Sequence, residues 1–198
     1  MEPTLAQIAQ DAYNEKRQAR YGDLMLDPDL STPETSVYRN PLTRQLVIGS
    51  RGTKIAPKSL LSDLHSDVQL ALGSDPTERL ARAASTVDAA RAKYAGDSLT
   101  FTGHSLGGTL SARLAERYPD SEATTYNRGA GLPTMGDLKC KIGGVFGAAP
   151  KYCGRINNYR IRGDGASLLG RAFGSGNWST RPGQGSMLDR HAASNFAR

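Results

Sequence analysis

Apolar positions near the start of the chain repeat first at helical and then at strand spacing. From Leu5 to about Arg20 they fall three or four positions apart, which predicts one amphipathic helix. Two short β-prone runs follow at 36–38 and 45–48, and the Asn40-Pro41 pair between them is typical of a hairpin turn. The pattern therefore predicts a helix, a turn-rich segment and a two-stranded hairpin.

Further along, segments of helical spacing alternate with short β-prone runs. The predicted helices are 60–72, 76–96 and 106–118. The predicted strands are 99–102, 123–126 and 158–161. This alternation favours an α/β fold, with a mostly parallel central sheet flanked by helices. Residues 163–186 are rich in Gly and Ser, and we expect a long loop there.

The length of 198 residues fits a single domain over 1–198, in which 1–36 form an N-terminal helix and a connecting segment. No apolar run reaches the roughly 18 residues that a transmembrane helix needs. The first residues also lack the basic and apolar regions of a secretory signal peptide. We therefore expect an intracellular or virion-delivered protein whose membrane contact, if it has one, is peripheral.

The formal net charge is +6, but the basic residues are scattered along the sequence. A nucleic-acid-binding protein more often shows a basic stripe interleaved with aromatic residues, so no nucleic-acid partner is expected. The charge favours contact with anionic surfaces such as membranes, and a soluble surface without a partner is an equal alternative. Nothing in the sequence indicates an oligomeric state.

Two cysteines, Cys140 and Cys153, flank a glycine-rich stretch. They are too few for a disulfide framework, and neither belongs to a CxxC pair that would indicate zinc or redox chemistry. Two free thiols is the preferred interpretation, and a single disulfide closing the loop is the alternative in an oxidising compartment. No metal or organic cofactor is expected.

The candidate chemistry starts from Gly103-His104-Ser105-Leu106-Gly107, a G-x-S-x-G pattern. Alone it is weak, but it stands between a β-prone run and a helical segment, the strand–turn–helix setting of a nucleophile elbow. In so tight a turn both glycines are needed, because larger residues would collide with the neighbouring strand and helix. The alternative is a Gly-Ser turn that caps a helix. The pattern in its context predicts Ser105 as a nucleophile, with a helix N-terminus that favours negative charge beside it.

A serine hydroxyl needs a base, and the chain has three histidines. His104 adjoins the serine, so its side chain leaves the backbone in another direction and a packing role beneath the turn is expected. His65 lies in a predicted helix ahead of the serine. In α/β-hydrolases the chain order is Ser, then Asp or Glu, then His, and only His191 fits this order.

The acid that orients the histidine should lie between the two and follow a strand. The candidates are Asp120, Asp137, Asp164 and Asp189. Asp120 ends the helix after the turn, Asp137 is expected in a Gly-rich loop, and Asp189 is too close in sequence to the histidine. Asp164 follows a predicted strand through Gly163, where strand ends present catalytic groups. We therefore predict Asp164, with an ordinary turn aspartate as the alternative.

Several segments in the same order resemble the class 3 lipase family of α/β-hydrolases, over about residues 37 to 196. The matching segments are 47–53, 62–64, 103–108, 126–129, 162–164 and His191 with 194–196. Only the serine pattern is specific by itself, and the ordered set is a much stronger signal. The resemblance identifies a compact, lid-poor member of the family.

The resemblance implies that Thr53 helps to form an oxyanion hole, with the Leu106 N–H as the second donor. Two such donors hold a tetrahedral oxyanion where its charge develops. An ordinary basic turn is the alternative interpretation of Arg51-Gly52-Thr53. One departure is that only 54–61 separate Thr53 from the next predicted helix, too short for the family's helical lid. We therefore expect an open site, as in viral or intracellular members.

Together these residues predict a serine carboxylic-ester hydrolase that acts on acyl lipids, a lipase or phospholipase. Ser105 attacks the ester carbonyl, His191 takes and returns the proton, and Asp164 holds the imidazole tautomer. The expected substrate is an acyl lipid or ester, and the basic surface favours a phospholipid. Two alternatives stay open: a non-catalytic membrane-binding or virion-associated module on a hydrolase fold, and an acyltransferase that uses the same three residues.

Overall fold

The computed structural model describes residues 3–52, 76–129 and 135–197. Its eight strands are β1 (Arg20–Tyr21), β2 (Leu24–Leu26), β3 (Thr35–Asn40), β4 (Gln45–Ser50), β5 (Ser98–His104), β6 (Ser121–Tyr126), β7 (Ile156–Ile161) and β8 (Asn177–Arg181). Its helices are α1 (Pro3–Asp11), α3 (Pro76–Lys93), α4 (Leu106–Arg117), α5 (Met135–Phe146), α6 (Gly165–Phe173) and α7 (Met187–His191), with two 3-10 turns, η1 (Lys151–Arg155) and η2 (Ala193–Asn195).

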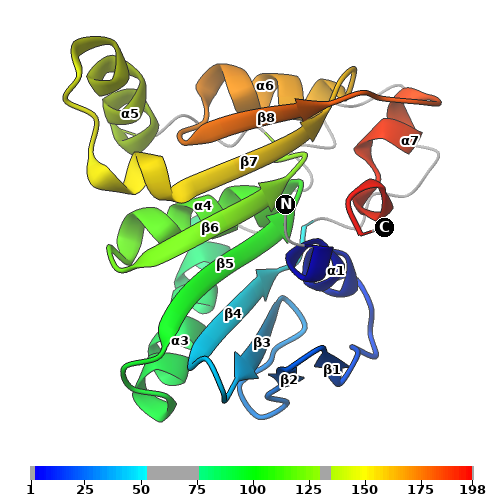
Figure 1. The fold of residues 1–198 in the computed structure, drawn as a ribbon, viewed down its shortest axis with the longest axis vertical. Helices are drawn as coiled ribbons and strands as arrows, with labels where there is room; N and C mark the ends of the chain where they lie inside the picture. Colours follow the sequence, from blue (N-terminus) through cyan, green and yellow to red (C-terminus); the bar gives the residue numbers. More distant parts are fainter. Residues whose placement is uncertain (1–2, 53–75, 130–134, 198) are drawn as a thin grey trace.

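All strands form one sheet in the order in which they occur in the sequence, β1 to β8. The pairs from β1 to β4 are antiparallel, and those from β4 to β8 are parallel. Figure 1 shows the sheet between α1 in front and α3 and α4 behind. The predicted fold, an α/β-hydrolase type with a mostly parallel sheet and flanking helices, is confirmed. Because parallel strands end at one edge, the residues that follow β5, β6 and β7 come together there.

Two apolar clusters bury both faces of the sheet. One joins α3 and α4 to the sheet through residues such as Val87, Leu114 and Ile48. The other lies under α1, where Ile8 packs with Val47. With both faces covered, β4 shows an unbroken apolar run from Leu46 to Ile48 instead of alternation. In the described residues, no helix is both long and apolar enough to cross a membrane.

The predicted hairpin, the helix that begins at Pro76, the helix after Ser105 and the three later strands are all present. The first predicted helix is too long, because α1 ends at Asp11. The Asp11 carboxylate accepts hydrogen bonds from Gln18 N–H and the Tyr38 hydroxyl, and so folds the following segment back. The predicted helix at 60–72 lies outside the described residues.

The long loop expected at 163–186 is wrong, since α6 and β8 occupy much of it. Asp164 begins α6 by accepting a hydrogen bond from Ser167 N–H. β8 pairs with β7 at the edge of the sheet, and its residues are mostly exposed. A solvated edge strand has no apolar alternation, so its sequence carries no strand signal.

The preference for two free thiols is also wrong. Cys140 of α5 and Cys153 of η1 form a disulfide, with their Cα atoms 5.7 Å apart. The expected Gly-rich loop around Asp137 is instead the start of α5. The fold brings α5 back against η1, which places the two sulfur atoms in bonding range.

Candidate active site

Ser105 stands in the tight turn between β5 and α4 with a φ of 56°. A non-glycine residue in this region is strained, and such strain is concentrated at functional sites. A Cβ atom on Gly103 would overlap the Gly107 backbone, and one on Gly107 would overlap the Ser50 carbonyl oxygen. The two glycines therefore let strand and helix approach closely enough to present the serine side chain at the sheet edge.

The turn is held from the neighbouring strand end. Ser105 N–H donates to the Tyr126 carbonyl at 3.0 Å, and Gly129 N–H donates to the Ser105 carbonyl at 3.2 Å. The Thr109 hydroxyl donates to the Gly129 carbonyl at 2.9 Å. These bonds join the serine turn to the end of β6 and, through Gly129, to Thr109 of α4, and so hold the backbone of Ser105 in place.

The structure brings Ser105, His191 and Asp164 into one hydrogen-bonded row. His191 Nε2 lies 3.0 Å from Ser105 Oγ, and His191 Nδ1 lies 2.8 Å from Asp164 Oδ1. A carboxylate only accepts, so Nδ1 carries the proton and Nε2 is free to accept the serine proton. The row therefore has the donor and acceptor directions that a serine nucleophile needs.

Asp164 is buried, with 1% of its surface exposed, in the turn after β7. Burial opposes its charge, but hydrogen bonds from His191 and Ser167 outweigh burial and lower the pKa of the carboxyl group below its ordinary value. The carboxylate is thus ionised at neutral pH and favours a positive charge on the adjacent imidazole.

The main chain that carries His191 is held by two buried side chains from neighbouring strand ends. Asn127 Nδ2 donates to the Arg190 carbonyl at 2.7 Å, and its Oδ1 accepts from Ile161 N–H at 2.9 Å. His104 Nε2 lies against the His191 carbonyl oxygen. His191 is therefore held in the hydrogen-bonded row through its backbone as well as through its ring.

The bonding partners define the tautomer of His104. A carbonyl only accepts, so His104 Nε2 carries the proton, and Nδ1 accepts from the Tyr13 hydroxyl at 3.2 Å. Burial lowers the pKa of His104 to about 3, with the positive charge on a protonated His191 as a further cause. His104 is therefore neutral, and it has the packing position beneath the turn that its place in the sequence suggested.

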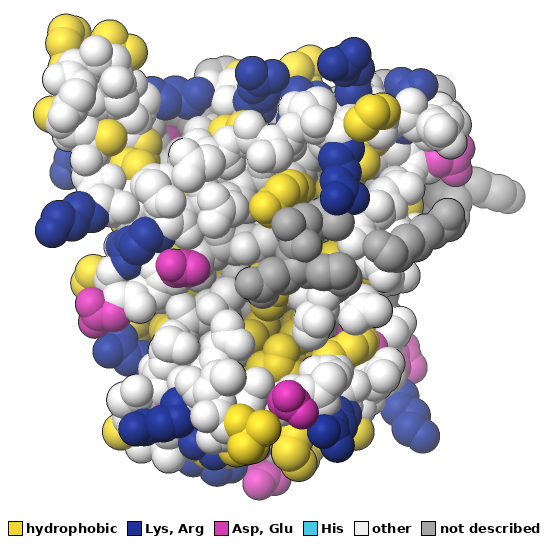
Figure 2. All heavy atoms as spheres, in the orientation of Figure 1, with side chains coloured by type: hydrophobic (Ala, Val, Ile, Leu, Met, Phe, Trp, Pro, Cys, Tyr) yellow, Lys and Arg dark blue, Asp and Glu magenta, His cyan; other side chains and the backbone are white. Residues whose placement is uncertain are grey.

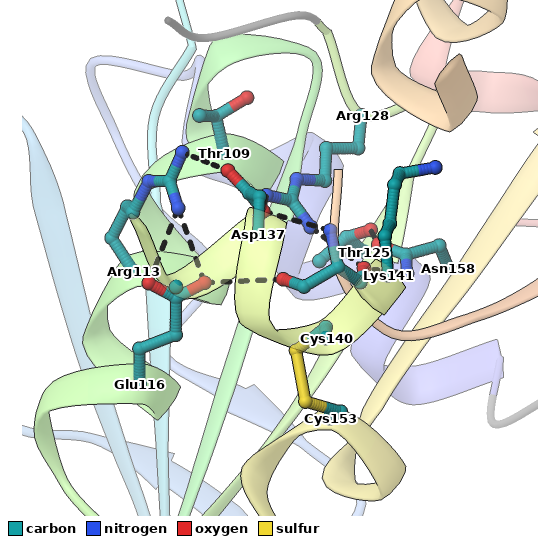
Figure 3. A network of polar contacts seen from close by, with 12 residues as sticks. Thr109, Arg113, Glu116, Thr125, Arg128, Asp137, Cys140, Lys141, Cys153 and Asn158 are labelled. Carbon is teal, nitrogen blue, oxygen red and sulfur yellow. Dashed lines mark hydrogen bonds and ion pairs between the residues drawn. A yellow bond between two sulfur atoms is a disulfide. The ribbon is translucent and has the colours of Figure 1, made fainter. Parts of the chain in front are cut away.

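Behind the turn lies a buried network of ion pairs, drawn in Figure 3. Arg128, 2% exposed, lies 3.4 Å from Asp137 Oδ1, and Arg113 lies 2.6 Å from the other oxygen. Ser175 N–H also donates to Asp137 at 2.8 Å. Burial lowers the pKa of Arg128 to about 10, although Asp137 opposes the shift. The network joins α4, α5 and the segment that contacts the serine turn.

Thr53, a residue of the expected site, lies outside the described residues, and so does His65, the histidine that chain order set aside. Leu106 begins α4, so its N–H belongs to the first turn, where backbone donors have no helical partner. Asp189 caps α7 in a capping box with Ser186, which leaves it no part in the row.

Sequence reasoning missed Tyr13 and the role of Asn127. Both act through contacts to residues more than 60 positions away. No local pattern marks such contacts. The available signal was the aromatic-Asn pair at 126–127, which matched the class 3 lipase pattern but did not indicate what Asn127 does.

Residues 4–192 match the family model described as Phospholipase-like, Tle-like phospholipase domain. No curated protein matches by sequence. Among solved structures, Lip2 lipase from Yarrowia lipolytica shares 15% identity over 91% of this chain and 76% of that one, with a TM-score of 0.56. A lipase from Rhizopus microsporus var. chinensis shares 13% identity over 98% of this chain and 83% of that one, with a TM-score of 0.63.

A triacylglycerol lipase whose catalytic centre is a serine protease triad gives 17% identity, 89% and 77% coverage and a TM-score of 0.57. At these identities the likeness concerns the fold.

Proposed function

We propose, from its membership of the Tle-like phospholipase family, that the chain hydrolyses acyl esters of phospholipids with Ser105 as the nucleophile. The family consists of ester hydrolases of the lipase and phospholipase type. The expected place among the lipase-type α/β-hydrolases is confirmed by this family match and by the fold shared with the fungal lipases. The observation that supports the nucleophile is the hydrogen-bonded row of Ser105, His191 and Asp164.

In the proposed mechanism, Ser105 Oγ attacks the ester carbonyl carbon while its proton moves to His191 Nε2. The tetrahedral intermediate collapses, the bond to the alcohol oxygen breaks, and His191 returns the proton to that oxygen. A water molecule then attacks the acyl-serine with His191 again as the base, which releases the fatty acid and restores the hydroxyl. Asp164 stays ionised throughout and stabilises the imidazolium.

The intermediate places a negative charge on the former carbonyl oxygen. We assign the Leu106 N–H as one donor to it, because it lies at the N-terminus of α4, where the helix dipole favours negative charge. Thr53, proposed as the second donor, lies outside the described residues, and its assignment rests on the family resemblance. Removal of one such donor typically lowers kcat by about 10²–10³-fold.

The test compares Ser105→Ala with wild type on p-nitrophenyl esters and on a panel of phospholipids and triacylglycerols. We expect the variant to lose about 10⁴-fold or more in kcat, with unchanged circular dichroism. Ser111→Ala is the matched control, since Ser111 is a buried serine on α4 whose hydroxyl has no hydrogen-bond partner among the described residues. Equal activity of Ser105→Ala and wild type would refute the proposal.

Two other functions use the same fold. An acyltransferase would pass the acyl group to an alcohol or lysolipid, and product analysis with such acceptors present separates it from hydrolysis. A non-catalytic module would leave Ser105 unreactive, so a fluorophosphonate probe would fail to label it. The row of three side chains at hydrogen-bond distance supports hydrolysis over a scaffold role.

A further inference from the structure

Helix α5 exposes large apolar side chains to solvent. Leu138 and Ile142 are 47% and 50% exposed, and Val145 and Phe146 are 79% and 78% exposed. Among the side chains whose exposure the structure describes, only three other large hydrophobic residues are as exposed, and they lie in separate parts of the fold: Met25, Leu42 and Leu168. Surface hydrophobic residues are ordinary when scattered, whereas a group of them marks an interaction site.

The spacing of these residues gathers them on one side of the helix. Leu138, Ile142 and Val145 are four and three positions apart, and Phe146 is four positions after Ile142. Residues three and four apart are neighbours on a helix surface, so the side chains form a continuous apolar stripe. Figure 2 shows hydrophobic side chains gathered over α5 at the upper left of the molecule.

The opposite side of α5 is joined to the protein by other means than apolar burial. Asp137 pairs with Arg113 and Arg128, and Cys140 is bonded to Cys153. Gly143 packs so closely on the backbone that an added Cβ would lie 2.6 Å from the Ala149 Cα atom. Ion pairs and a disulfide, both drawn in Figure 3, and a glycine contact thus fix this helix, and its apolar side chains are left exposed.

The charges around the stripe are positive. Lys139 and Lys141 on α5 and Lys151 on η1 are exposed, and so is Arg171, whose carbonyl accepts a hydrogen bond from Lys141. Between residues 135 and 155 the only carboxylate is Asp137, which is buried in ion pairs. An exposed apolar stripe with a cationic rim matches a surface that has anionic headgroups above an apolar interior.

We propose that α5 is the element by which this protein docks on an anionic phospholipid bilayer. Its apolar stripe enters the boundary between headgroups and acyl chains, and the surrounding lysines contact the headgroups. The inference deepens the proposed function by naming the surface that meets the lipid, but docking does not require the serine hydroxyl. Arg128 pairs with Asp137 of α5, and the neighbouring Gly129 donates to the Ser105 carbonyl, so α5 and the serine turn contact the same segment.

The experiment is sedimentation with vesicles of phosphatidylglycerol and, separately, of phosphatidylcholine, all in the Ser105→Ala background so that no lipid is consumed. We expect Val145→Ser/Phe146→Ser to lower binding to phosphatidylglycerol vesicles at least tenfold. Met25→Ser/Leu42→Ser is the control, because it removes two exposed apolar side chains elsewhere, and it should bind as the parent does.

A second pair of changes tests the charge. Lys139→Gln/Lys141→Gln should weaken binding to phosphatidylglycerol, and the parent should bind phosphatidylcholine more weakly. Circular dichroism and urea midpoints confirm that each variant is folded.

Equal binding by the α5 variant and the control would overturn the inference, as would a parent protein that binds neither vesicle. Self-association without lipid that only the α5 changes abolish would also overturn it, in favour of a second copy on this face. If Ser105→Ala keeps activity but vesicle binding depends on α5, the catalytic proposal fails and the docking proposal stands.

Discussion

Acid stability provides a direct test of the neutral histidine beneath the serine turn. His104 is buried and donates from Nε2 to the His191 backbone, so its protonation in the folded state is unfavourable. In the unfolded chain its pKa returns to the ordinary value of 6.5, whereas in the folded protein it is about 3. Between these values the unfolded state binds a proton that the folded state does not, so the free energy of unfolding must fall as the pH falls.

The size of the effect follows from linkage. Each pH unit between the two pKa values changes the free energy of unfolding by about 1.36 kcal/mol. From pH 7 to pH 5 the loss that His104 contributes is therefore about 2 kcal/mol. This window avoids the carboxylates, because the ordinary pKa values of Asp and Glu, about 3.9 and 4.3, lie below it.

The assay is urea unfolding followed by Trp178 fluorescence at pH 7, 6 and 5, on wild type and on His104→Gln. Glutamine keeps an amide donor near the position of Nε2 but does not titrate. We expect the variant to be less stable than wild type at pH 7 and the difference between the two to shrink by about 2 kcal/mol at pH 5. Parallel curves for the two proteins would refute the reasoning, since His104 would then titrate alike folded and unfolded.

Three further predictions concern the framework of the site. Gly107→Ala should prevent folding or abolish labelling of Ser105 by a fluorophosphonate probe, because its Cβ would overlap the adjoining strand end. Gly144→Ala is the control: its Cβ would have open space around it, and it should raise the free energy of unfolding in urea by roughly 0.5–1 kcal/mol. Cys140→Ser/Cys153→Ser should lower the free energy of unfolding by about 2–4 kcal/mol, a difference that disappears when both proteins are measured with a reductant. Asp137→Asn leaves a buried arginine without its carboxylate and should cost about 3–5 kcal/mol, and a loss below 1 kcal/mol would show that the pair is unimportant.

The central strands and the serine turn could be predicted from the sequence because their constraints are local. β4, covered on both faces, has an unbroken apolar run, and the turn at Ser105 leaves no room for a Cβ atom at Gly103 or Gly107. Chain order and the scarcity of histidine selected His191, and the position after a strand selected Asp164. The structure brings these side chains together, and their catalytic roles stay predictions until the variants are measured.

The remaining features depend on contacts that no local pattern records. β8 is a solvated edge strand, and its residues do not alternate between apolar and polar. α5 exposes its apolar side, whereas an apolar stripe in a sequence normally predicts the buried side of a helix, so the pattern cannot show how α5 packs. The pairing of Cys140 with Cys153 follows from the return of α5 against η1. Tyr13 reaches His104 from 91 residues away in the sequence.

The sequential order of the strands has a consequence for how the enzyme is made. Neighbours in the sheet are neighbours in the sequence, so each strand can pair soon after it leaves the ribosome, starting from β1. Ser105 follows the fifth strand, but His191 comes after the eighth. During synthesis Ser105 therefore leaves the ribosome before His191, the residue proposed as its base. On the proposed mechanism, a chain that stalls before His191 lacks its base and hydrolyses lipid esters far more slowly than the finished chain.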